Sequence, residues 1–308
     1  MDETKTPSDE GKKSLKARTV TAIVYVVAWI ALSALKWFVP HNYGALGFDA
    51  VFCAISIIGS FEFLRAIGGV SFPQHAFTMA FATVIVPIHV VMELTMNAGL
   101  LAVACAFAIY VMFLMATSVF DPLRSTVKGT ISCIFCMLYC GILSTILSAI
   151  NHLAQNSMAA ILLLFMATVF SDTGAYLFGS LFKRWLPWKL SPKLSPNKTI
   201  IGAIGGLIGG LVGGILAYVL ITCLGGNNGV LLTFSSDRVV SGVSFMLIGL
   251  ATAFLAQVGD LFESAVKREC GIKDMGKLLP GHGGILDRFD SMLYCSVVVL
   301  LCFGTIIV

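Results

Sequence analysis

The chain has 308 residues, of which 57% are hydrophobic and 12% are charged, and its mean hydropathy is +0.92. A soluble domain carries about 25% charged residues, so this chain has too little charge to cover a water-facing surface. The composition therefore excludes a soluble enzyme, a disordered chain and a disulfide-stapled secreted domain. Apolar runs of about 18 or more residues, the length that crosses a hydrocarbon core, recur from end to end and indicate a polytopic membrane protein.

The predicted elements are nine apolar helical spans that follow a short polar tail at residues 1–18. The tail is expected in the cytosol. It is not a secretory signal, because the apolar run after it is too long and lacks a small-residue cleavage site. The spans are predicted at residues 19–38, 45–67, 75–95, 98–120, 128–151, 157–180, 199–224, 239–266 and 289–308. The expected fold is an all-α transmembrane bundle without strands or a soluble domain.

The distribution of Lys and Arg among the loops predicts the orientation of the bundle. With a cytosolic N-terminus, every Lys and Arg except Lys36 and Arg238 lies on the cytosolic side. Nine spans then place the C-terminus outside. Two basic loops, 181–198 and 267–288, face the cytosol in this topology.

Ionisable residues divide the chain into two parts. Residues 19–156 contain only isolated acids within their spans (Asp49, Glu62 and Glu93) and are expected to form a scaffold. Residues 157–308 concentrate their charges near the cytosolic span ends. Ionisable groups at membrane depth are costly and usually mark function, so this second part is the predicted catalytic region.

The strongest stretch for chemistry covers residues 257–290. Its first part is predicted to be helical, so Asp260, Ser264 and Lys267 share one face, with Arg268 beside them. A carboxylate, a hydroxyl and two cations at a helix end suit a metal-bound polyphosphate. The alternative is a helix end whose basic side chains snorkel to the membrane interface, but snorkelling needs no acids.

A glycine-rich run at residues 280–284 follows and cannot form a regular helix. Glycines let a backbone approach a ligand closely with exposed N–H groups. His282, within the run, is either a turn residue or a ligand-binding residue. Asp287, Arg288 and Asp290 begin the last span. Acids there can be simple helix caps, but two acids flanking an arginine beside a glycine loop favour a binding site.

A third candidate lies in the sixth span, where Asp172 stands between Ser171 and Thr173. A carboxylate placed well inside a span is expensive unless it meets a cation, a metal or water. A structural bond to a neighbouring helix is the alternative.

A fourth candidate is the stretch 193–199, which opens the seventh span. Ser195 and Pro196 fit a helix entry, and Lys198 with the N-terminal N–H groups makes an anion site. The seventh span itself is rich in glycine. We interpret these glycines as helix-packing residues and not as a nucleotide fingerprint, because no strand is predicted before them.

With these residues laid out, the chain resembles the phosphatidate cytidylyltransferase (CDP-diacylglycerol synthase) family. The family's C-terminal signature is matched in order and spacing by Ser264, Lys267, Arg268, Lys273, Asp274, Pro280, His282, Gly283, Gly284, Asp287, Arg288 and Asp290. The resemblance also covers residues 172–176 and 195–199, and so extends over roughly residues 165–308.

The resemblance implies a nucleotidyltransferase of phospholipid biosynthesis. Such an enzyme makes CDP-diacylglycerol and pyrophosphate from CTP and phosphatidic acid with Mg²⁺. A phosphate monoester has its second pKa near ~6, so the lipid phosphate attacks the α-phosphorus of CTP without a dedicated base. The barrier is electrostatic, because an anion attacks a triphosphate, and metal-binding acids with basic side chains lower it.

The resemblance implies Asp260 and Asp287 as ligands of Mg²⁺. Asp290 is the candidate for a third ligand, and a second cation is left open. The predicted catalytic residues are Asp260, Asp287, Lys267, Arg268 and Arg288. The predicted substrate-binding residues are Ser171, Asp172, Thr173, Ser195, Lys198, Thr199, Ser264, Lys273, Asp274, His282, Gly283 and Gly284.

The expected partners are CTP, phosphatidic acid and the lipid bilayer, with a homodimer as a candidate assembly and no nucleic acid. The expected location is the cell (inner) membrane with the site facing the cytosol. One alternative is a CTP-dependent polyprenol or phytol kinase, which would need a base for its alcohol substrate. The other is an ion-coupled transporter with Asp172, Asp260 and Glu263 as a cation path, but the internal repeats typical of transporters are not evident.

Overall fold

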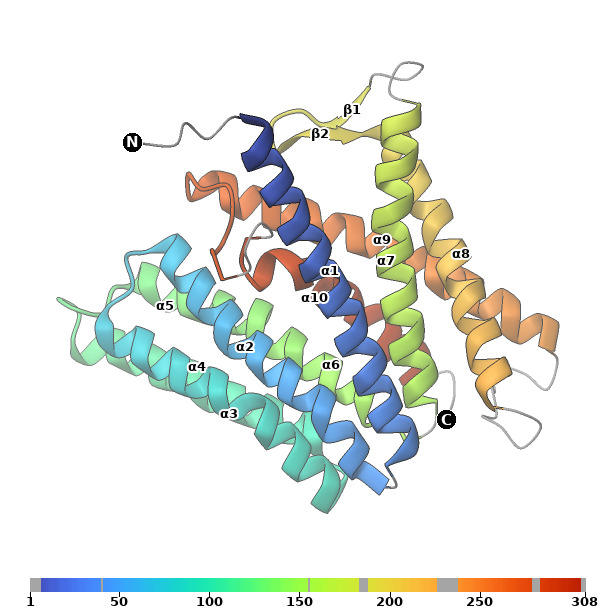
Figure 1. Ribbon diagram of the computed structural model, residues 1–308. Helices are drawn as coiled ribbons and strands as arrows, with labels where there is room; N and C mark the ends of the chain where they lie inside the picture. The colour runs from blue at the N-terminus through green and yellow to red at the C-terminus, as the bar shows by residue number, and fades with distance from the viewer. Residues whose placement is uncertain are drawn as a thin grey trace, which may run out of the picture.

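The computed structural model describes residues 7–39, 41–154, 156–182, 188–225, 238–278 and 283–305. Long helices make up nearly all of this structure, and a short hairpin lies at one end of the bundle (Figure 1). The first part contains α1 (Pro7–Phe38), a 3₁₀ turn (His41–Ala45), α2 (Leu46–Ile67), α3 (Phe72–Met96), α4 (Gly99–Phe120), α5 (Val127–Cys136), a π-helical turn (Met137–Ile142) and α6 (Leu143–Asn151). The second part contains α7 (Ser157–Leu181), β1 (Lys189–Ser191), β2 (Ser195–Thr199), α8 (Ile200–Gly225), α9 (Arg238–Glu269) and α10 (Leu286–Thr305).

The prediction of an all-α, multi-pass bundle is confirmed. Within the described residues, 7 helices are long and apolar enough to cross a membrane. The two other predicted spans correspond to α1 and α10. The described apolar part of α1 is the shorter helix Ile23–Phe38, and α10 begins with three ionisable residues within its first five.

The glycines of α8 are packing residues, as predicted. A Cβ at Gly209 would overlap the carbonyl oxygen of Phe170 in α7, and a Cβ at Gly214 would overlap the carbonyl oxygen of Phe245 in α9. Small residues therefore let α8 lie against both neighbours at backbone contact. This close packing brings the ends of α7, α8 and α9 together.

The expectation of a chain without strands is wrong in one place. Strands β1 and β2 form an antiparallel hairpin that pairs Lys189 with Thr199 and Ser191 with Ser195. The segment expected to open the seventh span is thus extended, because a residue before proline disfavours the helical conformation. The helix begins one residue after Thr199, whose Oγ1 accepts the N–H of Gly202 at 3.1 Å and caps it.

Two of the isolated acids of the first part have structural partners. Asp49 is buried; its Oδ1 accepts hydrogen bonds from Ser148 at 2.7 Å and Asn151 at 3.0 Å, and its Oδ2 lies 2.8 Å from Nε2 of His152. Glu93 accepts the N–H of Gly99 at 2.9 Å. These contacts join α2 to the end of α6 and α3 to the start of α4.

Helix α10 connects the two parts of the chain. It packs against α7 and α9 of the second part and against α2 and α6 of the first. Its N-terminal turn, which carries the acids predicted for the site, therefore lies where both parts meet.

Candidate active site

A cavity of about 890 Å³ lies where the ends of α7, α9 and α10 meet β2 and the start of α8. Most of the charged residues predicted for the site line it, although they come from four separate segments. The predicted residues that line the cavity are Asp172, Ser195, Lys198, Thr199, Asp260, Lys267, Asp274, Asp287, Arg288 and Asp290. The tertiary structure thus brings together motifs that are up to 118 residues apart, from Asp172 to Asp290.

Helix α9 supplies one charged face of the cavity. Asp260, Glu263 and Lys267 recur at helical spacing and all line it. Asp260 forms an ion pair with Lys198 of β2, so the hairpin is tied to α9 across the cavity. The predicted cations and acids of these two motifs are therefore in direct contact.

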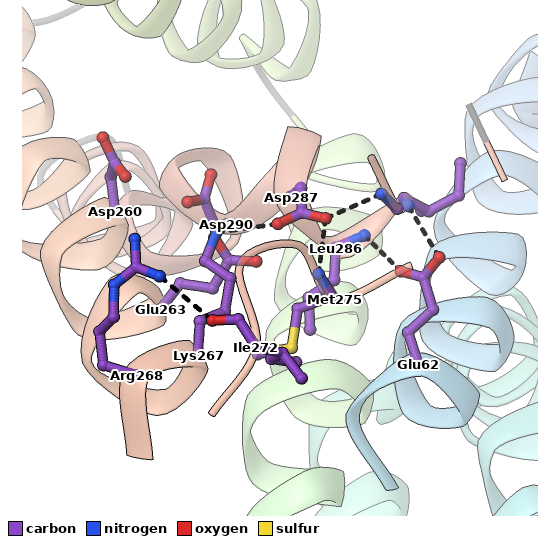
Figure 2. A network of polar contacts seen from close by, with 12 residues as sticks. Glu62, Asp260, Glu263, Lys267, Arg268, Ile272, Met275, Leu286, Asp287 and Asp290 are labelled. Carbon is purple, nitrogen blue, oxygen red and sulfur yellow. Dashed lines mark hydrogen bonds and ion pairs between the residues drawn. The ribbon is translucent and has the colours of Figure 1, made fainter. Parts of the chain in front are cut away.

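Lys267 lies between two carboxylates. Its Nζ donates to Oε2 of Glu263 at 2.7 Å and to Oδ1 of Asp287 at 2.8 Å (Figure 2). Glu263 is buried, and the side chain of Lys267 is only 12% exposed. The two carboxylates hold the ammonium group of Lys267 in a fixed position and offset its charge.

Asp287 holds the loop that precedes α10. Its Oδ2 accepts the N–H of Met275 at 2.9 Å and the N–H of Gly284 at 2.8 Å, while its Oδ1 binds Lys267. Asp287 therefore acts as a cap and loop anchor in this structure. Its predicted role as a metal ligand stays a prediction.

Arg268 has a different place from its neighbour Lys267. It is exposed, and its guanidinium donates to the carbonyl of Leu194 at 3.3 Å and to that of Ile272 at 3.2 Å. Arg268 thus connects the turn of the hairpin to the loop after α9. It is not among the residues that line the cavity.

Several predicted substrate-binding residues also lie off the cavity. Ser171 is buried, and its hydroxyl has no hydrogen-bond partner among the described residues. Thr173 donates to the carbonyl of Val169 at 2.8 Å. The others that do not line the cavity are Ser264, Lys273, Gly283 and Gly284, and His282 lies outside the described residues.

Sequence reasoning did not assign Asn197, Ser180 or Ser291 to the site, although all three line the cavity. Each lies within seven residues of a predicted site residue, but an uncharged polar side chain carries no signal of its own. Sequence reasoning also left Glu62 without a role. A buried acid at membrane depth is costly, and that cost was the available signal that Glu62 has partners.

The acids of the cavity suit an oxygen-binding cation. Asp172, Asp260 and Asp290 all line it, and the charges of the other two act on Asp172. Within the described part of the chain, no group of three His, Cys, Asp or Glu side chains is arranged to hold a metal ion by itself. Mg²⁺ needs only one or two carboxylates when water and substrate phosphates complete its shell. The acids of the cavity therefore fit Mg²⁺ only where other ligands complete its coordination shell.

The fold and the cavity define an integral membrane protein with a cavity lined by both acids and cations at one end of its helices. A family model for the cytidylyltransferase family matches residues 16–306, and the chain belongs to this family. The family predicted from the C-terminal signature is thereby confirmed.

Curated relatives agree with this assignment. The chain is 33% identical over 153 residues to a phosphatidate cytidylyltransferase of Haemophilus influenzae, covering 49% of this chain and 48% of that one. It is 32% identical over 192 residues to phosphatidate cytidylyltransferase 5, chloroplastic, of Arabidopsis thaliana, covering 57% and 43%. A phosphatidate cytidylyltransferase of Helicobacter pylori is 55% identical over 60 residues, covering 19% and 23%. The matched stretches thus span less than half the length of these relatives.

Proposed function

We propose that the chain is a phosphatidate cytidylyltransferase that makes CDP-diacylglycerol and pyrophosphate from CTP and phosphatidic acid. The observation that carries the proposal is the cavity, which gathers Lys198, Lys267 and Arg288 among carboxylates at the end of an apolar bundle. A nucleotide and a lipid headgroup need such a place, where a polar site opens next to membrane-spanning helices. Membership of the cytidylyltransferase family and the names of the relatives support this reading.

The charged residues have separate tasks in this reaction. The lipid phosphate is the nucleophile, so the protein orients two polyanions and offsets their repulsion. Lys267, held by two carboxylates, would keep its ammonium group in a fixed position at the cavity, where it can donate to a phosphate oxygen. Lys198, which is ion-paired with Asp260, lies next to the N-terminus of α8, whose N–H groups favour anions. Arg288 completes the basic set from the first turn of α10.

A Mg²⁺ ion is the cofactor that we propose for this site. Asp260, with Asp290 or Asp172, would hold it, since the ion pair of Asp260 with Lys198 uses one of its oxygens, whereas both oxygens of Asp287 are engaged. When bound, Mg²⁺ would neutralise charge on the triphosphate and on the leaving pyrophosphate. A second cation remains compatible with the three acids.

We further propose that the cavity faces the cytosol of a cell membrane. The loops 181–198 and 267–288 both contribute residues to the cavity and are rich in Lys and Arg. Such loops stay on the cytosolic side. CTP would reach the cavity from that side.

The test is the transfer of label from CTP to lipid by the purified protein. With phosphatidic acid, the α-phosphorus of CTP is expected in CDP-diacylglycerol, and the γ-phosphorus is expected in pyrophosphate. Appearance of the γ-label in a polyprenol or phytol would contradict the proposal and indicate a kinase. The proposal would also be contradicted if the folded protein, supplied with Mg²⁺, CTP and phosphatidic acid, formed no labelled lipid.

A further inference from the structure

Glu62 of α2 contacts the N-terminus of α10, although the two segments are more than 220 residues apart in the sequence. Its Oε1 accepts the N–H of Ile285 at 3.1 Å, and its Oε2 accepts the N–H of Leu286 at 3.0 Å (Figure 2). Glu62 is 5% exposed, so little water competes for these bonds. The first N–H groups of a helix have no partner within the helix, and a carboxylate satisfies them and favours the positive end of the dipole.

The backbone around Glu62 leaves no room for other side chains. A Cβ at Gly276 would overlap Oε1 of Glu62, and a Cβ at Gly284 would overlap both of its carboxylate oxygens. Two glycines of the loop before α10 thus lie directly against one carboxylate. Of the glycines predicted to approach a ligand, Gly284 approaches this side chain of the protein itself.

The same loop is also held from the cavity side. Asp287 accepts the N–H groups of Met275 and Gly284 with one oxygen and binds Lys267 with the other. The entry to α10 therefore lies between two carboxylates, with Glu62 on the side of the first part of the chain and Asp287 on the side of the cavity. Of these two carboxylates, only that of Asp287 lines the cavity.

We propose that Glu62 is a positioning residue for the reaction. By binding the first N–H groups of α10, it sets where Asp287, Arg288 and Asp290 stand relative to Lys267 and Asp260. This inference rests on the cytidylyl transfer proposed above. Through this one side chain, which does not line the cavity, the first part of the chain would help to position the site.

The chemistry at position 62 is specific for a carboxylate of this length. Glutamine has one carbonyl oxygen for the two N–H groups, and its own NH₂ would face one of them. Aspartate keeps both oxygens and the charge but is one methylene shorter. Glu62→Gln therefore tests the negative charge and the second acceptor oxygen, and Glu62→Asp tests the length of the side chain.

Glu93→Gln is the matched control. Glu93 is also an acid of the first part, and it also accepts a backbone N–H, from Gly99 at 2.9 Å. It holds the junction of α3 and α4, which contributes no residue to the cavity. Glu93 is only partly buried, so the control is matched in its hydrogen bond to a backbone N–H and not in burial. A general effect of losing a carboxylate that accepts a backbone N–H would appear in both variants, whereas loss of the positioning contact would appear only at position 62.

Three measurements on the full-length protein in detergent with phosphatidic acid test the proposal. They are kcat and KM for each substrate, the thermal midpoint, and the rate of tryptic cleavage after the exposed Lys273 and Lys277, identified by mass spectrometry. For Glu62→Gln we expect kcat to fall about 10–100-fold, which is the usual effect of replacing a residue that supports a site. The change in KM for phosphatidic acid should be smaller. Cleavage after these lysines should be faster than in the parent. Glu62→Asp should recover part of kcat, and Glu93→Gln should match the parent in kcat and cleavage.

Parent values of kcat and cleavage in Glu62→Gln would overturn the proposal. An equal loss of kcat and of thermal midpoint in Glu62→Gln and Glu93→Gln would overturn it as well, because the effect would then be general stability. If Glu62→Gln does not fold, Glu62→Asp decides by the same readouts. If the parent forms no CDP-diacylglycerol, the proposed function fails. The cleavage rates would then still show whether Glu62 holds the loop.

Discussion

Replacement of Lys267 by methionine tests the electrostatic reading of the cavity most directly. The change keeps the length of the apolar stem and removes the ammonium group that binds Glu263 and Asp287. Two effects are expected together. The reaction loses a fixed positive charge, and two carboxylates that are at most 4% exposed lose their cation.

The magnitudes follow from this arrangement. Removing one partner of a buried ion pair costs about 3–5 kcal/mol, because the remaining charge is left uncompensated. Removing one preorganised group that stabilises the transition state costs about a hundredfold or more in kcat. Lys267→Met should therefore lower both the thermal midpoint and the turnover.

A double variant separates the two effects. Glu263→Gln in the Lys267→Met background removes the uncompensated charge of Glu263, whose other oxygen has no hydrogen-bond partner among the described side chains. The thermal midpoint should rise again, while kcat should stay low because the cation is still missing. A double-variant cycle with Glu263→Gln alone gives the coupling between the two residues.

The assay is formation of CDP-diacylglycerol from α-labelled CTP, normalised to folded protein. Arg268→Gln is the control, because Arg268 is the adjacent cation on α9 but lies off the cavity and binds two carbonyl groups. It should lose less activity than Lys267→Met. The reasoning is refuted if the double variant regains the parent kcat, since Lys267 would then serve only to neutralise Glu263.

Three further predictions concern the metal, the scaffold and the orientation. Asp260→Asn should raise the Mg²⁺ concentration for half-maximal turnover about tenfold or more. Asp287→Asn should lower kcat without changing this Mg²⁺ concentration. An equal rise in Asp287→Asn would indicate that Asp287 is a metal ligand. Asp49→Ala should destabilise the protein by about 2–4 kcal/mol, measured by thermal unfolding, because it removes three buried polar contacts, while kcat per folded molecule stays at the parent level. A cysteine at Lys277 should react with an impermeant thiol reagent only from the cytosolic side, and labelling from outside intact cells would reverse the topology.

Much of the fold was open to prediction because membrane insertion leaves a simple signal. A span needs a long apolar run, so hydropathy alone located the helices from α2 to α9 within a few residues of their bounds. Local chemistry overrode this signal in the hairpin. The segment Ser195–Thr199 adjoins an apolar run, but Pro196 and the capping hydroxyl of Thr199 keep it extended.

The charged face of α9 was also open to prediction, since helical spacing places Asp260 and Lys267 on one side without knowledge of any other element. The residues that pair with Asp260 and Lys267 could not be predicted from the sequence. That Lys198 pairs with Asp260, and that Glu62 binds the start of α10, depends on how helices far apart in the sequence pack. An isolated acid in an apolar span indicates only that some partner exists. Which N–H group or cation satisfies it is decided by tertiary packing, because burying a charge requires a partner within hydrogen-bond reach and sequence spacing does not specify that distance.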